Sequence, residues 1–303
     1  MQQFAFVFTC SPFAPCLSED LLQQKNILVN FNVSDELHWL APNVACEILT
    51  TVTMERARSM LISIRKVLSE QPIDVNAVVA NDQRQKSLVI ADMDSTIIKQ
   101  ECIDELGVAA GVGDKIQSIT EQAMQGKLNF DDALRARVKL LHNLPVTIFG
   151  YILNEHICLN SGALEFIQTM RLKGAYCVLV SGGFTAFTAI IAERVGFNSH
   201  KANSFEIDNG KLTGRILDPI LNGEAKVKIL QDLLADRNLS KNQCLVVGDG
   251  ANDIAMIKHA GLGCAFRAKP AVNDNADVII RHCDLTALLY LQGFSFNSFY
   301  SER

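Results

Sequence analysis

The stretch VIADMDST, residues 89–96, decides how the rest of the chain is interpreted. It begins within a short apolar run, residues 88–91, that is typical of a buried strand in a parallel sheet. Asp92 and Asp94 stand where that strand ends, and ligands of open α/β sheets bind just beyond the carboxyl ends of strands. The two carboxylates could hold a hard cation or divide acid and nucleophile roles, but Asp and Ser are also common in solvated turns. The rest of the chain decides between these interpretations.

Length and composition indicate a globular protein of more than one unit. Its 303 residues exceed a typical domain, so about two or three folding units are expected. The net charge of −5 and the lack of a basic run argue against a nucleic-acid partner. The chain has no stretch of about 18 apolar residues, so we expect no membrane span. The first residues lack a positively charged start and predict a strand rather than a signal peptide.

The nine cysteines are odd in number, scattered, and never spaced as C-x-x-C. Cys177 and Cys244, for example, stand in apolar runs. This pattern argues against a disulfide framework or a zinc site. It predicts buried free thiols and a cytoplasmic location, where thiols stay reduced.

Residues 1–82 are expected to form a small α+β domain without site motifs. Alternating strand-like and helix-like runs are predicted at 4–8, 19–29, 45–52, 55–69 and 73–79. The polar segment 81–86 is predicted to be a linker. A regulatory role, a role in forming a homodimer, and plain scaffolding all remain open for this unit.

Residues 87–293 predict an α/β fold, because strands alternate with helices as in a doubly wound parallel sheet. Strands are expected at 88–91, 176–180, 244–247, 263–266 and 278–280, with a hairpin at 203–216 around a D-N-G turn. The segment at about 99–158, between the first two strands, is all helical in pattern and is expected to form a cap over the site.

Three of these strands end in residues that carry chemistry. The second strand ends at Ser181 and two glycines, and a helix follows. This order is typical of a phosphate-binding site. The third ends in a glycine turn with Asp249 and Asp253. A phosphate monoester is anionic, so its charge must be neutralised before attack. Carboxylates at this edge could bind Mg²⁺, while Ser181 and Lys226 bind phosphoryl oxygens.

The motifs D-M-D-S-T, S-G-G-F, a lysine, and G-D-G-A-N-D occur in this order and resemble the four motifs of the haloacid dehalogenase (HAD) superfamily of phosphatases. The resemblance spans about residues 87–290 and is closest to the members that act on phosphoserine, whose cap is similar to segments 101–106 and 126–130. It implies a Mg²⁺-dependent hydrolase that converts O-phospho-L-serine to L-serine and phosphate, the last step of serine biosynthesis. It does not extend to residues 1–82.

The resemblance also implies roles for individual residues. Asp92 would be the nucleophile that forms an aspartyl-phosphate, and Asp94 would protonate the leaving serine oxygen and then activate water. The metal ligands would be Asp92, Asp94 and Asp249. The phosphate would be held by Ser181, Gly182, Lys226 and Asn252. Asp253 would orient these residues without contacting the phosphate itself.

Selectivity for phosphoserine requires an acid and a base in the cap, because the substrate has an ammonium and a carboxylate besides its phosphate. Glu101 could reach the ammonium, and Arg137 could grip the carboxylate bidentately. Met124 and Phe130 could close an apolar lid that excludes water. Charged residues on cap helices are mostly solvated, so it is the resemblance that selects Glu101 and Arg137.

Two other functions are compatible with the sequence. The aspartyl-phosphate could pass its phosphoryl group to another alcohol such as homoserine, since acceptor choice depends on the shape of the cap. A non-catalytic sensor of phosphorylated ligands would be expected to lack the nucleophile or the lysine, and both are present. Product analysis with and without homoserine separates transfer from hydrolysis.

Overall fold

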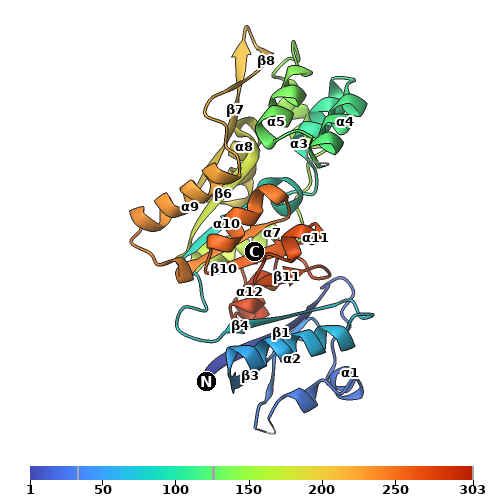
Figure 1. Cartoon of the computed structure of the whole chain (residues 1–303), viewed down its shortest axis with the longest axis vertical. Helices are drawn as coiled ribbons and strands as arrows, with labels where there is room; N and C mark the ends of the chain where they lie inside the picture. The colour runs from blue at the N-terminus through green and yellow to red at the C-terminus, as the bar shows by residue number, and fades with distance from the viewer. Residues whose placement is uncertain (33, 125–126, 302–303) are drawn as a thin grey trace.

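The computed structural model describes residues 1–32, 34–124 and 127–301, and it contains two β-sheets. A four-stranded sheet has the strand order β2-β3-β1-β4, and a seven-stranded sheet has the order β11-β10-β9-β5-β6-β7-β8. Figure 1 shows the first sheet at one end of the molecule, the second in the middle, and the cap helices at the other end. The predicted α/β fold with a helical cap and an N-terminal α+β unit is confirmed.

The N-terminal sheet is antiparallel and buried on both faces. Its elements are β1 (Gln2–Cys10), α1 (Glu19–Gln24), β2 (Leu37–Ala41), β3 (Ala45–Val52), α2 (Met54–Val67) and β4 (Ile73–Val79). Alternate residues of β1 point to opposite faces. Phe4 and Phe6 pack in a cluster with α2, whereas Ala5 and Val7 join the core of the larger unit. Sequence reasoning missed β2, whose first three residues are partly or fully exposed.

Side chains of β4 bind the edge strand β11 (Val278–Ile280) of the larger sheet. The Asn76 amide donates to the Ile279 carbonyl and accepts from the Ile279 N–H, both at 2.9 Å. The buried Asp74 carboxylate accepts three backbone N–H groups of residues 281–283, each at 2.9 Å. These contacts cover an edge that would otherwise present unpaired backbone groups.

The polar segment 81–86 connects the two units and is also bound to both. The Arg84 guanidinium forms an ion pair with Glu47 and donates to the Leu291 carbonyl at 2.9 Å. The Lys86 ammonium donates to the Asn242 carbonyl at 2.7 Å. The predicted linker is therefore a fixed connection, because its charged side chains have partners on either side.

The larger sheet has β5 (Leu88–Ala91) in the middle, between β6 and β9. Its other strands are β6 (Tyr176–Phe184), β7 (Ser199–Asp208), β8 (Lys211–Leu217), β9 (Cys244–Gly248), β10 (Leu262–Phe266) and β11. The strands pair in parallel except β7 and β8, which form the predicted hairpin. The helices of this unit are α7 (Ala163–Leu172), α8 (Thr185–Val195), α9 (Gly223–Asp236), α10 (Ile254–His259), α11 (Pro270–Asn273) and α12 (Ala287–Leu291).

The cap consists of α3 (Cys102–Ala109), α4 (Gly113–Met124), α5 (Phe130–Lys139) and α6 (Ile148–Glu155). Backbone hydrogen bonds attach it to the β7–β8 hairpin: Asn143 N–H donates to the Leu212 carbonyl at 2.9 Å, and Val146 N–H to the Gly210 carbonyl at 3.0 Å. The cap therefore rests on the hairpin as well as on the loop that follows β5. None of the helices in the described ranges is long and apolar enough to span a membrane.

Candidate active site

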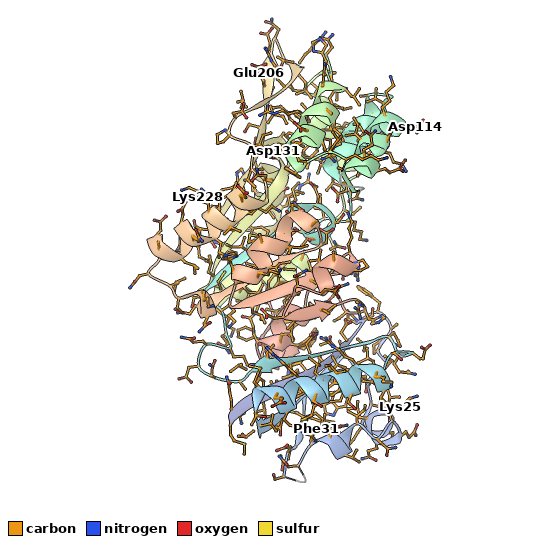
Figure 2. All side chains as sticks on the ribbon, viewed as in Figure 1. Lys25, Phe31, Asp114, Asp131, Glu206 and Lys228 are labelled. Atoms are coloured by element: carbon orange, nitrogen blue, oxygen red, sulfur yellow. The ribbon has the colours of Figure 1, made fainter. Side chains whose placement is uncertain are left out.

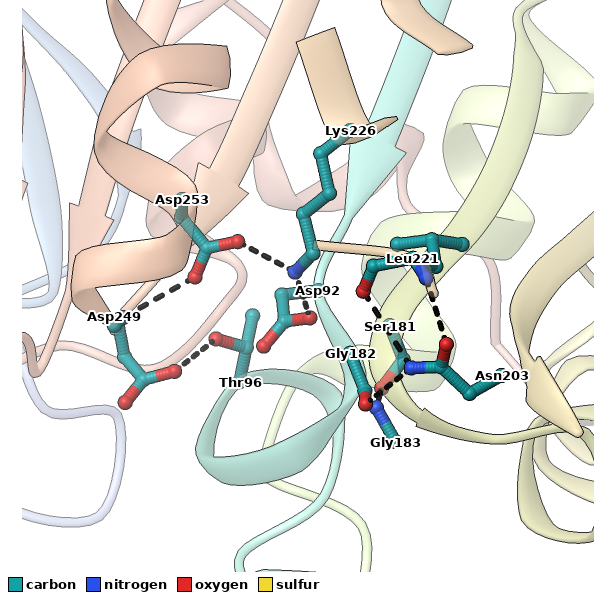
Figure 3. A network of polar contacts seen from close by, with 11 residues as sticks. Asp92, Thr96, Ser181, Gly182, Gly183, Asn203, Leu221, Lys226, Asp249 and Asp253 are labelled. Carbon is teal, nitrogen blue, oxygen red and sulfur yellow. Dashed lines mark hydrogen bonds and ion pairs between the residues drawn. The ribbon is translucent and has the colours of Figure 1, made fainter. Parts of the chain in front are cut away.

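The candidate site lies where β5, β6 and β9 end together (Figure 3). Ala91, the last residue of β5, pairs with Leu179 on one side and Val247 on the other. The residues that follow these three positions therefore meet at one edge of the sheet, as the sequence predicted. Asp92 is fixed at this edge by its N–H, which donates to the Val247 carbonyl at 3.0 Å.

An irregular turn at Met93–Ile97 carries the second carboxylate, Asp94. Ser95 within it has a φ of +56°, a left-handed conformation that non-glycine residues rarely adopt. The Ser95 hydroxyl donates to the Glu101 carboxylate at 2.8 Å, and Cys102 N–H donates to Asp94 Oδ1 at 3.2 Å. The start of α3 thus positions the turn that carries Asp94, and it brings Glu101 next to that turn.

Lys226, in the first turn of α9, is completely buried against two carboxylates. Its ammonium lies 2.6 Å from Asp92 Oδ1 and 2.7 Å from Asp253 Oδ1 (Figure 3). Burial alone would lower the pKa of Lys226, but the carboxylates of Asp253 and Asp92 outweigh it and raise that pKa above its ordinary value. Lys226 is therefore positively charged at neutral pH.

The surroundings of the carboxylates in the site favour their protonated form. Burial, followed by repulsion from Asp253, raises the pKa of Asp92 well above its usual range. Burial and the same neighbour raise the pKa of Asp249 to about 7. Burial and Glu101 raise the pKa of Asp94 to about 7. Among the described residues, the carboxylates of the site outnumber its ammonium groups, Lys226 and Lys269, so the site has an excess of negative charge.

This donor set fits a hard divalent cation. Oxygen atoms of Asp92, Asp249 and Asp253 all lie within 4.8 Å of one another. Oxygen is the ligand type that Mg²⁺ and Ca²⁺ prefer. Asp94, predicted as a ligand, is not part of this group. Asp253, predicted to orient its neighbours, is held on both oxygens: Oδ1 by Lys226 and Oδ2 by Gly250 N–H at 3.1 Å.

The irregular end of β6, residues 181–184, forms a bulged loop with the geometry of an anion-binding site. The buried Ser181 hydroxyl oxygen accepts Gly183 N–H at 2.8 Å, which leaves its own O–H free to donate. Glycine is required here because a Cβ on Gly183 would lie 2.8 Å from Asp94 Oδ2. A Cβ on Gly182 would lie 3.0 Å from the Phe130 ring.

Asn203 supports this loop and was missed by sequence reasoning. Its buried amide donates to the Gly182 carbonyl at 2.8 Å and accepts from Leu221 N–H at 2.6 Å (Figure 3). It therefore ties the end of β6 to the segment that leads into α9 and Lys226. In the sequence it is only a polar residue inside a strand, a signal too weak to identify this role.

A cavity of about 540 Å³ lies between this edge and the cap. Its wall includes most of the predicted site residues: Asp92, Asp94, Glu101, Phe130, Arg137, Ser181, Gly182, Asp249 and Asn252. Lys226 and Asp253 are fully buried and do not line the cavity, but the Lys226 ammonium contacts Asp92, which does. The side chain of Met124 is outside the described part of the structure. Asp104, Thr120 and Lys269 also line the cavity, and sequence reasoning did not select them.

Comparisons with known proteins agree on one family. The model of the haloacid dehalogenase-like hydrolase family matches residues 89–258. The phosphoserine phosphatase of Saccharomyces cerevisiae is 32% identical over 308 residues, which cover 98% of this chain and 99% of that protein. The phosphoserine phosphatase of Haemophilus influenzae is 42% identical over 207 residues, 68% of this chain and 66% of that protein.

A solved structure gives the same result in three dimensions. A phospho-aspartyl intermediate analogue of a phosphoserine phosphatase superposes with a TM-score of 0.64 at 39% identity. The match covers 68% of this chain and 98% of that one. The matched segment covers 68% of this chain in both comparisons. It spans slightly less than two thirds of the length of the Haemophilus protein.

Proposed function

The chain belongs to the haloacid dehalogenase-like hydrolases, among the phosphoserine phosphatases, and on this premise we propose that it hydrolyses O-phospho-L-serine to L-serine and phosphate. The observation that carries the proposal is the Asp92 carboxylate, buried at the end of the central strand and bound by Lys226 at 2.6 Å. The same cavity is lined by an acid and a base, Glu101 and Arg137, suited to the amino-acid end of the substrate.

The proposed reaction has two steps. In the first, a carboxylate oxygen of Asp92 attacks phosphorus, the bond from phosphorus to the serine oxygen breaks, and Asp94 gives that oxygen its proton. In the second, Asp94 takes a proton from water, the water oxygen attacks phosphorus, and the aspartyl-phosphate bond breaks. A pKa of about 7 suits Asp94 for both tasks, because such a group can donate and accept protons near neutral pH.

The phosphoryl group would be bound by four groups: the Ser181 hydroxyl, the Gly182 N–H, the Asn252 amide and the Lys226 ammonium. The free O–H of Ser181 supports this assignment. Lys226 serves twice, since its charge also opposes the effect of burial on the pKa of Asp92 and so favours the ionised, nucleophilic form. Phe130, packed against Gly182, would shield the site from water.

The metal would be Mg²⁺, held by Asp92, Asp94 and Asp249. When bound, it would neutralise part of the charge of the phosphate group. The excess of carboxylates over ammonium groups supports a divalent cation at this place, and the oxygen donors support a hard one. Asp253, occupied by Lys226 and Gly250, would keep that lysine in place.

The amino-acid end would be recognised by the cap. Glu101 would bind the ammonium and Arg137 the carboxylate, as charge-assisted hydrogen bonds inside the cavity. Supporting this, Ser95 fixes Glu101 beside the catalytic turn, and Arg137 lines the same cavity from α5. The cavity volume of about 540 Å³ is ample for one small amino-acid ester.

The test is a panel of phosphate monoesters assayed with Mg²⁺ and with EDTA. We expect phosphoserine to have the highest kcat/KM, and EDTA followed by dialysis to abolish turnover. An enzyme that prefers another monoester, or works equally well without metal, would contradict the proposal. Adding homoserine distinguishes hydrolysis from transfer, because transfer would yield phosphohomoserine in place of free phosphate.

We also propose a cytoplasmic enzyme with two domains, 1–82 and 87–293, the second including the cap at about 99–158. The nine cysteines are free thiols, and seven of them are buried, which suits a reducing compartment. One hydrophobic cluster consists only of residues before residue 80, which supports a separate N-terminal core.

A further inference from the structure

β4 is an edge strand of the N-terminal sheet and lies on the side of the larger unit (Figure 1). One of its edges pairs antiparallel with β1, and Ala80, directly after β4, donates its N–H to the Gln3 carbonyl at 2.9 Å. Hydrogen-bonded positions alternate along an antiparallel pair, so every second residue counted back from Ala80 bonds to β1. Ala77 and Val79 lie between those positions. Their N–H and C=O groups therefore point away from β1, toward the free edge of the sheet.

The free edge of β4 is open at Ala77 and Val79. Two residues earlier, the Val75 carbonyl accepts Arg65 Nε at 2.8 Å, which agrees with this alternation and occupies that part of the edge. Among residues 1–32, 34–124 and 127–301, no hydrogen bond reaches the N–H and C=O groups of Ala77 and Val79 from beyond the edge. Both residues are half-buried. Backbone groups left unpaired at a sheet edge are a template for one more strand.

A cavity of about 400 Å³ lies against this edge, and its wall includes Ala77 and Val79. One stripe of α2 lines it, with residues three and four positions apart: Met54, Ala57, Arg58 and Leu61. The connecting segment 81–86 and Leu262, the first residue of β10, form other parts of the wall. The candidate active site is at the carboxyl ends of parallel strands, whereas this cavity touches the start of β10. The two sites are therefore at opposite ends of the larger sheet.

The wall of this cavity carries more positive than negative charge. Arg58 is exposed and has no ion pair within the described ranges. The Lys86 ammonium donates to two backbone carbonyls, at 2.6 and 2.7 Å, and likewise pairs with no carboxylate there. The charge of Arg84 is matched by Glu47. Among the described residues of the wall, the one acid is Asp277, so a ligand with negative charge is favoured.

We propose that this cavity is a docking site for an extended, acidic peptide segment of another protein, which adds a short strand to the free edge of β4. The backbone of the segment would pair with Ala77 and Val79, a mode of recognition in which main-chain hydrogen bonds provide affinity. Side chains of a strand alternate between two faces, so acidic residues can meet Arg58 while apolar ones lie on Leu61. Because the open edge is only about three residues long, the partner binds weakly and reversibly.

Fluorescence anisotropy of a labelled peptide, Glu-Val-Glu-Val-Glu with blocked ends, tests the proposal on the full chain. We expect saturable binding that weakens as salt is added, because salt screens exposed charges. The same peptide with a fully N-methylated backbone keeps its charges but cannot donate to the edge, so it should bind at least about 10-fold more weakly. A peptide with lysine in place of glutamate should bind more weakly still.

Variants of the chain locate the binding at this edge. Ala77→Pro removes the outward N–H and obstructs the edge but keeps the bonds to β1, because proline is tolerated where a strand's N–H faces away from the sheet. It should weaken binding at least about 10-fold, whereas Ala77→Val, which keeps the N–H, should stay within about twofold of the wild type.

A second pair of variants tests the charge. Arg58→Glu should weaken binding about 3- to 10-fold at low salt, and Arg56→Glu is the matched control at an exposed position of the same helix outside the cavity. Both should keep the wild-type melting temperature and phosphatase rate, since the cavity is remote from the candidate active site. This pair and the N-methylated peptide keep the test decisive if Ala77→Pro does not fold.

Several outcomes would overturn the inference. Equal binding of the N-methylated peptide would mean that the edge of β4 does not pair with the ligand, and equal losses in Arg58→Glu and Arg56→Glu would mean that the charge of the cavity is not read. No saturable binding up to about 1 mM peptide would remove the site altogether. A wild-type chain that sediments as a dimer, with Ala77→Pro a monomer, would assign the edge to a second copy of this chain instead of a peptide.

Discussion

At the scale of single residues, the site depends on one buried ammonium between two carboxylates. Lys226 is fully buried, and it lies within 2.7 Å of an oxygen of both Asp92 and Asp253. Removing one member of such a group leaves an uncompensated buried charge, which is far more costly than losing a surface ion pair. The lysine therefore contributes to folding and to chemistry at once.

Replacing Lys226 by Met should lower both stability and turnover. We expect the free energy of unfolding to fall by about 3–5 kcal/mol, since Asp92 and Asp253 remain buried without their partner. Urea denaturation at pH 7.5 measures this change. Lys228→Met, an exposed position on the same helix (Figure 2), should change stability little. Equal stability of the two variants would show that the ammonium is not needed for folding.

Replacing either of the two carboxylates after β5 should reduce turnover, but to different extents. Asp92→Asn keeps the shape of the side chain but removes the nucleophile, so turnover should fall by several orders of magnitude. Asp94→Asn should lower kcat by about 10²–10⁴, the usual contribution of a general acid–base group. Initial rates with phosphoserine measure both. A fully active Asp92→Asn enzyme would rule out the covalent route.

The pKa values of the site predict how stability depends on pH without metal. Asp94 and Asp249 have folded-state pKa values of about 7, above the ordinary value of 3.8, so between these limits the folded protein binds more protons than the unfolded chain. The contribution of these two groups to stability should then be greatest at low pH and decline as pH rises toward 7. Melting temperatures of EDTA-treated protein from pH 5 to 8 measure this, and Asp249→Asn should flatten the decline. A steeper decline in that variant would contradict the assignment.

Residues whose role follows from their place at the end of a strand could be predicted from the sequence. Asp92 and Ser181 are examples, because a buried strand followed by a polar side chain specifies the site directly. Asp104, Thr120 and Lys269 could not be selected, because only the packing of separate elements brings them to the wall of the cavity. For Asp104, its position three residues after Glu101 was the one available signal.

At the scale of elements, the site is assembled by segments that hold each other in place. Asn203, on β7, bonds the glycine loop at the end of β6 and the segment before α9. The hairpin that β7 starts also carries the cap through the backbone bonds at residues 143–146. The strand that supports the anion-binding loop therefore continues into the hairpin that supports the cap.

Asn203→Ala should weaken this assembly. Losing its amide leaves the buried Gly182 carbonyl and Leu221 N–H without partners, at a cost of about 1–3 kcal/mol each. We expect a lower melting temperature and a lower kcat/KM. Asn203→Asp, which keeps the acceptor for Leu221 N–H but loses the donor to Gly182, should lie between. A variant with wild-type melting temperature and activity would show that the loop holds its shape alone.

Strands and helices with strong periodicity could be predicted well at this scale. β5 and β9 are continuous apolar runs buried on both faces, and both were placed correctly. β2 could not be found, because a half-exposed edge strand shows no regular alternation. The hydrogen bonds between the cap and the hairpin could not be predicted either, because they join backbone groups and do not depend on the pattern of side chains.

At the scale of the whole molecule, the N-terminal sheet is joined to the larger unit by specific polar bonds and a shared core. Asp74 and Asn76 complete the edge of β11, while Ala5 and Val7 pack into the hydrophobic core of the larger unit. Segment 81–86 was predicted to be a linker because it is polar. The sequence does not show which residues its side chains contact. In the structure Arg84 is bound on both sides.

Asp74→Ala should test how firmly the two units are joined. It leaves three backbone N–H groups of residues 281–283 without an acceptor, so the free energy of unfolding should fall by about 2–4 kcal/mol. Urea denaturation followed by fluorescence and by activity should show one transition in the wild type and a split or earlier one in the variant. Asp82→Ala, at an exposed position, is the control. Identical curves for both variants would show that these bonds contribute nothing.

The pairing of Asn76 with Ile279 also has a consequence for the order of synthesis. The two residues are 203 positions apart, and at about 5–20 residues per second a ribosome needs about 10–40 s to make the chain between them. All four strands of the N-terminal sheet exist long before β11 is made. During that interval the face with Ala5 and Val7 is exposed on the nascent chain, where a chaperone can bind it.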